Sequence, residues 1–182
     1  MDYTDVIKEH YQSHWGEFTE YTFSAEPICK LLPQFCILKF YPNEKRNSYT
    51  YATCGMSAND KEQGLELFIL APDENDFLIE MLAAAAHYHA SGNTLDLGHT
   101  VNFGCPWYDG SECDHGLISL PYLDGPSLEW LHNDTADIRF LWLIPITKEE
   151  REYKKGNGTE ALESLFEKNS FNYTDPFRKS VV

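Results

Sequence analysis

The stretch DIRFLWLIPITKEEREYKKGNGTEALESLF, residues 137–166, decides the fold that we expect. Its first ten residues, 137–146, form the most apolar run of the chain. Such a run is typical of a strand that is buried on both faces, so we expect it at the centre of a sheet. Thr147 and Glu150 follow with the spacing of a capping box, which predicts that a helix begins there and continues to about Lys155.

The second part of this stretch predicts another helix. The sequence GNG at 156–158 interrupts the chain, because glycine disfavours continuation of a helix. Residues 159–169 then place Leu162, Leu165 and Phe166 on one helical face. We therefore expect a strand, a helix, a break and a short helix with one apolar face.

The upstream chain supplies the other strands, which are bounded by proline and glycine. Strands cluster instead of alternating strictly with helices, and this favours the α+β class. We predict one α+β domain spanning residues 1–182, with a mixed, mainly antiparallel sheet flanked by helices. The segment WGEFTEYTF at 15–23 is interpreted as a connection. The further strands are expected at 35–41, 48–56, 64–72, 94–104 and 115–123, and the further helices at 3–15 and 73–93.

Charge limits the kinds of partner. The 182 residues carry 14 basic and 29 acidic side chains, a net charge of -15. That charge repels phosphate backbones and anionic lipids, so we expect neither nucleic acid nor membrane as a partner, and a basic protein suits it best. The chain has no apolar run of membrane-spanning length and no signal-peptide pattern at its start. With five scattered cysteines, an odd number, these features predict a cytoplasmic protein with reduced thiols.

The stretch GHTVNFGCPWYDGSECDHG, residues 98–116, is the densest in reactive groups. Its histidines and cysteines have the spacing H-x5-C-x7-C-x-H, which matches none of the compact zinc patterns. We therefore predict no metal and no cofactor. The alternative is a metal-dependent or thiol enzyme that uses His99, Cys105, Cys113 and His115.

Other catalytic patterns give no support for an enzyme. The sequence contains no G-x-S-x-G elbow, no GxxxxGK[ST] loop and no GxGxxG loop. The same stretch has the composition of an interface, since aromatic anchors surrounded by carboxylates would suit a cationic partner. A solvated structural loop with its tryptophan folded onto the core is the competing interpretation. The candidate contact residues are Trp107, Tyr108, Asp109, Glu112 and Asp114.

Several stretches resemble the suppressor-of-fused domain, most of all its bacterial single-domain members. The resemblance covers roughly residues 35–182, and its longest part is residues 138–166. The stretches that carry it are YTYATCGMS (49–57), LELFILAP (65–72), LGHTVNFG (97–104), residues 138–166 and DPFRKSV (175–181).

The resemblance implies an α+β domain that binds protein without catalysing a reaction. The two-domain animal member holds a segment of a transcription factor, partly by strand addition. Bacterial members look like immunity proteins of polymorphic toxin systems, so we expect this chain to bind and neutralise a basic toxin domain. His99 matches the family pattern and becomes the sixth candidate contact residue, although a structural hydrogen bond would explain it equally well. A structural module of a larger assembly is a third possibility, and the sequence leaves the oligomeric state open.

Overall fold

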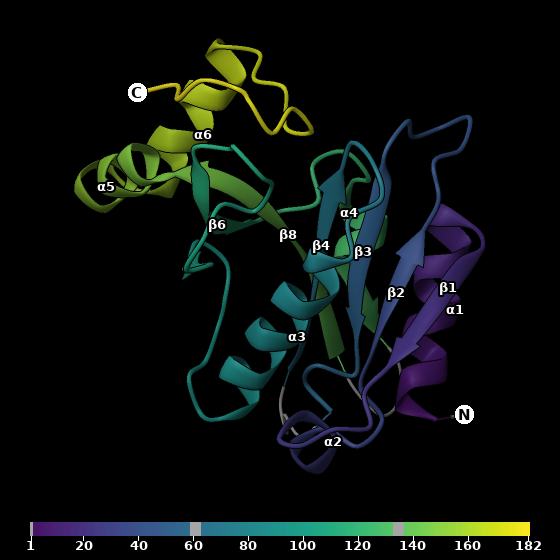
Figure 1. Ribbon diagram of the computed structural model, residues 1–182. Coiled ribbons are helices and arrows are strands. Elements are labelled where there is room, and N and C mark those ends of the chain that lie inside the picture. The colour runs from purple at the N-terminus through teal and green to yellow at the C-terminus, as the bar shows by residue number, and fades with distance from the viewer. Residues whose placement is uncertain (1, 59–62, 133–136) are drawn as a thin grey trace.

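The computed structural model describes residues 2–58, 63–132 and 137–182, and its elements form one mixed sheet flanked by helices (Figure 1). The predicted α+β class is confirmed. The strands are β1 (Phe18–Thr22), β2 (Cys36–Phe40), β3 (Tyr49–Cys54), β4 (Gly64–Ala71), β5 (Thr100–Asn102), β6 (Cys113–Ser119), β7 (Trp130–His132) and β8 (Asp137–Thr147). The helices are α1 (Tyr3–Trp15), α2 (Ile28–Leu31), α3 (Phe77–Ala90), α4 (Pro126–Glu129), α5 (Lys148–Asn157) and α6 (Thr159–Lys168).

The strand β8 lies inside the sheet, as predicted. Seven strands follow the order β1-β2-β3-β4-β8-β6-β5, and the eighth, β7, pairs with β8 outside this order. The β4–β8 pair is parallel, and the other pairs are antiparallel. Nine of the eleven β8 residues are buried, which agrees with the apolar run in the sequence.

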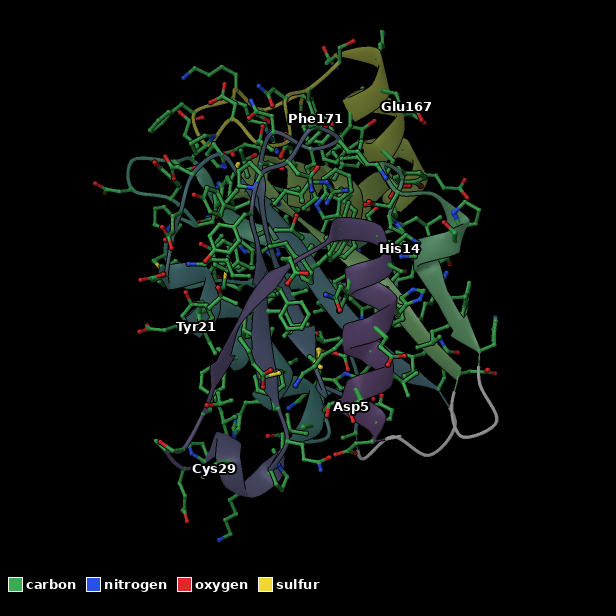
Figure 2. All side chains as sticks on the ribbon, turned by 90° about the vertical axis from the view of Figure 1, so that its right-hand side faces the viewer. Asp5, His14, Tyr21, Cys29, Glu167 and Phe171 are labelled. Carbon is green, nitrogen blue, oxygen red and sulfur yellow. The ribbon has the colours of Figure 1, made fainter. Side chains whose placement is uncertain are left out.

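Helices cover both faces of the sheet because its central strands are apolar on both sides. On one face α3 packs its buried residues, among them Leu78 and Leu82, into the first core (Figure 1). On the other face α1 and α6 supply Tyr11 and Phe166 to the second core. Figure 2 shows α1, with Asp5 and His14 near its two ends, lying across the sheet.

Two sequence expectations are corrected. The strand expected at 94–104 is only the three residues of β5, because the chain turns first: His99 N–H donates to the Asp96 carbonyl at 3.0 Å and Gly98 has φ 78°. The segment 15–23, expected as a connection, contains the edge strand β1. An edge strand pairs on one side and stays partly exposed, so it lacks the apolar pattern of an internal strand.

A buried ion pair fixes the C-terminal tail. The predicted capping box at Thr147 and Glu150 is present. The Glu150 carboxylate, with no exposed surface, also accepts two hydrogen bonds from the Arg178 guanidinium, both at 2.7 Å. Arg178 further donates to the Pro145 carbonyl at 2.9 Å, and Val181 N–H donates to Glu150 at 3.1 Å. One carboxylate thus joins the end of β8, the start of α5 and the tail.

We expect Arg178→Met to lower the free energy of unfolding by about 3–5 kcal/mol, because it leaves a buried carboxylate unpaired. Adding Glu150→Gln should restore part of that loss. Lys179→Met is the control, since the Lys179 side chain is 85% exposed. Urea unfolding curves measure all of these variants, and equal effects at positions 178 and 179 would contradict the structural role of the pair.

A second buried carboxylate shapes the turn after β3. Glu66, on β4, has no exposed surface and accepts hydrogen bonds from the Thr53 hydroxyl at 2.6 Å and from the N–H groups of Gly55 and Met56 at 3.0 Å each. Burial raises the pKa of Glu66 from 4.5 to about 7, and these hydrogen bonds oppose the rise.

We expect the stability contributed by Glu66 to fall with rising pH. Between about pH 4.5 and pH 7 the folded state keeps a proton that the unfolded state has lost, so the free energy of unfolding decreases by up to about 3 kcal/mol over that interval. Glu66→Gln should remove this decrease, and the exposed Glu160→Gln should retain it. Urea unfolding at pH 5, 6, 7 and 8 gives the comparison, and parallel curves for wild type and Glu66→Gln would contradict the expectation.

Candidate functional site

The structure contains a groove of about 870 Å³ between α3 and the short strand β5. The chain leaves the end of α3, swings away from the helix and returns to the sheet at β5, which pairs with β6 (Figure 1). Both walls contain apolar side chains. Phe77, Met81, Ala84 and Tyr88 belong to α3, and Val101 and Phe103 belong to the opposite wall.

The outer edge of β5 is unpaired in the part of the chain that the structure describes. On its inner side, Phe103 N–H donates to Asp114 at 3.0 Å and the His99 carbonyl accepts from Ile118 at 2.9 Å. Hydrogen-bonded positions alternate along an antiparallel strand, so the N–H and C=O groups of Thr100 and Asn102 point away from β6. The groove therefore has a strand edge that can accept another strand.

Charged and polar groups mark the end of the groove near the start of β5. The exposed His99 lines it, and the Nδ1 atom of its ring accepts from Asp96 N–H at 3.1 Å. Lys154, from α5, donates to the Gly98 carbonyl, and burial lowers its pKa. His99 thus makes the structural hydrogen bond considered above while its ring stays accessible.

The structure places Trp107 in the core. Its side chain is 1% exposed and belongs to the first core, and its Nε1 atom has no hydrogen-bond partner among the described residues. An anchor for a partner needs an exposed ring, so Trp107 is removed from the candidate contact residues. The competing interpretation, a tryptophan folded onto the core, describes this position correctly.

The other candidate residues of this loop keep accessible surface. Tyr108 is partly exposed, and its hydroxyl donates to Asp73 at 2.8 Å, which raises its pKa. Asp109 and Glu112 are exposed, and Glu112 lies 3.6 Å from the Lys179 ammonium. Asp114, whose side chain is 39% exposed, lies 2.6 Å from the His115 ring nitrogen.

The four residues of the alternative enzyme hypothesis lie in different surroundings. Cys113 is buried, and burial raises the pKa of its thiol to about 11, so it is not an activated nucleophile. Cys105 and His99 are exposed, whereas His115 is buried beside Asp114. Within residues 2–58, 63–132 and 137–182, no three His, Cys, Asp or Glu side chains are placed to hold a metal ion.

Sequence reasoning missed the groove itself. Its α3 wall was expected only as part of the helix at 73–93, and the structure leaves Phe77 partly exposed and Tyr88 52% exposed on it. An aromatic residue at the end of an otherwise alanine-rich helix was the available signal. No sequence signal indicated the free edge of β5, because strand order cannot be obtained from local patterns.

An α+β domain with a free sheet edge above an apolar groove has the architecture of a module that accepts an extended segment. The chain belongs to the suppressor-of-fused family: the model of the suppressor of fused protein (SUFU) matches residues 33–179. A search of curated protein sequences found no match.

Solved structures agree with this assignment. A suppressor-of-fused homolog from Neisseria gonorrhoeae is 34% identical, with a TM-score of 0.88 over 100% of this chain and 98% of that one. The fold is also that of a Sufu–Fu complex structure, at 12% identity and a TM-score of 0.71 over 98% and 92% of the two chains. It matches Drosophila Suppressor of Fused at 12% identity and a TM-score of 0.68, over 98% of this chain and 50% of that one.

No helix in the described ranges is both long enough and apolar enough to cross a membrane.

We expect Trp107→Ala to lower the free energy of unfolding by about 3–5 kcal/mol, because it empties a buried aromatic position. Asp109→Lys, two residues away and exposed, should change it by less than about 0.5 kcal/mol. Chemical unfolding of both variants makes the comparison. A small effect of Trp107→Ala would mean that the ring is not part of the core.

Proposed function

We propose that this protein is a non-enzymatic, cytoplasmic immunity protein, which binds a basic toxin domain and blocks it by taking one toxin segment as an added strand on β5. The observation that carries the proposal is the unpaired edge of β5 above the apolar groove. A relative of the same fold has been solved in a Sufu–Fu complex, which supports a protein-binding role.

Main-chain hydrogen bonds would hold the added strand in register. Thr100 and Asn102 direct their N–H and C=O groups outward, so each can exchange two hydrogen bonds with an incoming segment. Three residues of strand give few such bonds. Most of the affinity must therefore come from side chains that enter the groove.

The groove suits the alternating side chains of an extended segment. Successive side chains of a strand point to opposite faces, so every second residue would face α3. Phe77, Met81 and Phe103 offer apolar contact, and the small Ala84 leaves room between them. We therefore expect apolar residues at every second position of the bound segment.

Charge would favour a basic toxin and accelerate its approach. The net charge of -15 acts at long range, and the exposed carboxylate of Glu80, which lines the groove, acts at contact. The candidate contact residues that remain after the removal of Trp107 are His99, Tyr108, Asp109, Glu112 and Asp114.

We expect wild-type protein and Asn102→Ala to capture similar amounts of a partner. Asn102→Pro should retain about tenfold less of it, or even less. Both substitutions remove the side chain that accepts from Gly104 N–H, and only proline also removes the outward N–H of the edge. Ala84→Trp, at an exposed position of the groove wall, should fill the groove and also lose the partner. The measurement is quantitative mass spectrometry of the lysate proteins retained by the wild type and by the three variants.

The captured protein must then pass a test of function. Its production in a host cell should stop growth, and co-production of the wild-type chain, but not of Asn102→Pro, should restore growth. Equal capture by the wild type and all three variants would show that β5 and the groove are not the interface. A harmless partner that is sensitive to the same variants would overturn the immunity role and leave the binding role intact.

A further inference from the structure

Tyr108 and Phe177 form an exposed aromatic corner. Their rings pack edge to face with centroids 5.9 Å apart and planes at 85°. Phe177 is 60% exposed, although a phenyl ring gains free energy by burial. An aromatic pair in this state is the kind of surface at which proteins bind one another.

The fold holds this corner in a fixed position. Pro176 and Arg178, the neighbours of Phe177, are both buried, so the tail turns Phe177 outward between two anchors. The Ser111 hydroxyl donates to the Pro176 carbonyl, which ties the tail to the loop. Gly110 has φ 78°, and a Cβ atom there would lie 3.4 Å from the Phe177 ring. The exposure of Phe177 is thus a consequence of the packing around it.

Carboxylates surround the corner. The Asp73 carboxylate lies 2.8 Å from the Tyr108 hydroxyl, and the exposed Asp109 follows Tyr108 in the chain. Asp175 accepts from Phe177 N–H at 2.9 Å. Of the two basic residues that follow Phe177, Arg178 is buried against Glu150 and Lys179 lies beside Glu112. Asp73 and Asp109 form no ion pair within the described ranges of the chain.

The corner continues the groove at its Phe77 end. On the helix side, Asn75 donates to the Trp107 carbonyl at 3.4 Å and thereby joins the segment before α3 to the loop. On the strand side, Phe103 lines the groove and the chain runs from it to Tyr108. A segment lying on β5 would therefore reach the Tyr108–Phe177 corner as it leaves the groove.

We infer that the segment bound in the groove extends over the Tyr108–Phe177 corner and places an arginine or lysine there, between the ring faces and the carboxylates of Asp73 and Asp109. This inference rests on the proposed strand addition, and it specifies in addition that one end of the partner segment is basic. A cation over an aromatic face gains electrostatic energy, and nearby carboxylates increase it. The arrangement selects for a basic end on an otherwise alternating apolar segment.

Selection from a random dodecapeptide phage library on immobilised full-length protein tests this inference. Peptides selected by the wild type should alternate apolar residues and carry Arg or Lys at one end, enriched about two- to fivefold, the ratio equivalent to an exposed cation–π contact. The basic residues should lie at the amino end if the peptide runs antiparallel to β5, and at the carboxyl end if it runs parallel.

Two variants isolate the corner. Phe177→Leu keeps an apolar side chain but loses the ring face. Asp73→Asn with Asp109→Asn removes the charges and keeps an acceptor for the Tyr108 hydroxyl. Both should retain the apolar alternation and reduce the basic end to its frequency in the library. Asn102→Pro should lose the alternation as well.

The outcomes separate the two proposals. Apolar alternation without a basic end in the wild type, or a basic end that survives both corner variants, would overturn this inference alone. A wild type that selects no alternating peptide would overturn the strand-addition proposal and this inference with it.

Discussion

The burial of β8 on both faces is the constraint on which the rest of the structure depends. A strand with apolar side chains on both sides must be paired along its edges and covered above and below. The parallel partner β4, the antiparallel partners β6 and β7, and the two cores meet these requirements. The helices α3 on one face and α1 with α6 on the other are therefore not independent additions (Figures 1 and 2).

The buried Glu150 extends this constraint to the surface. A carboxylate without exposed area is tolerated only when its oxygens are fully paired, and here Arg178 and two backbone N–H groups pair them. Because Arg178 is fixed, the tail must cross the loop between β5 and β6 and present Phe177 there. A requirement of the core thus determines the shape of a surface that we assign to binding.

The edge of β5 and the groove carry the binding function that we propose. Native sheets usually protect their edges, and a three-residue edge strand is one such protection, since it offers few hydrogen bonds to a chance partner. A partner with apolar residues at alternate positions would use both the edge and the groove. In this proposal, selectivity for the partner follows from the combination of edge and groove and from the acidic surroundings. Such a role is consistent with membership of the suppressor-of-fused family.

Local patterns in the sequence determined the α+β class, the central position of β8 and the capping box at Thr147, and the summed charge predicts a basic partner. These features depend on neighbours within a few residues or on summed charge, both of which can be read along the chain. Tertiary structure alone decided that Trp107 is buried, that β5 is short with a free outer edge, and that Phe177 meets Tyr108. Burial, strand order and the contact between Tyr108 and Phe177, which are 69 residues apart, depend on how distant segments pack together. The local sequence around each of these residues does not encode that packing.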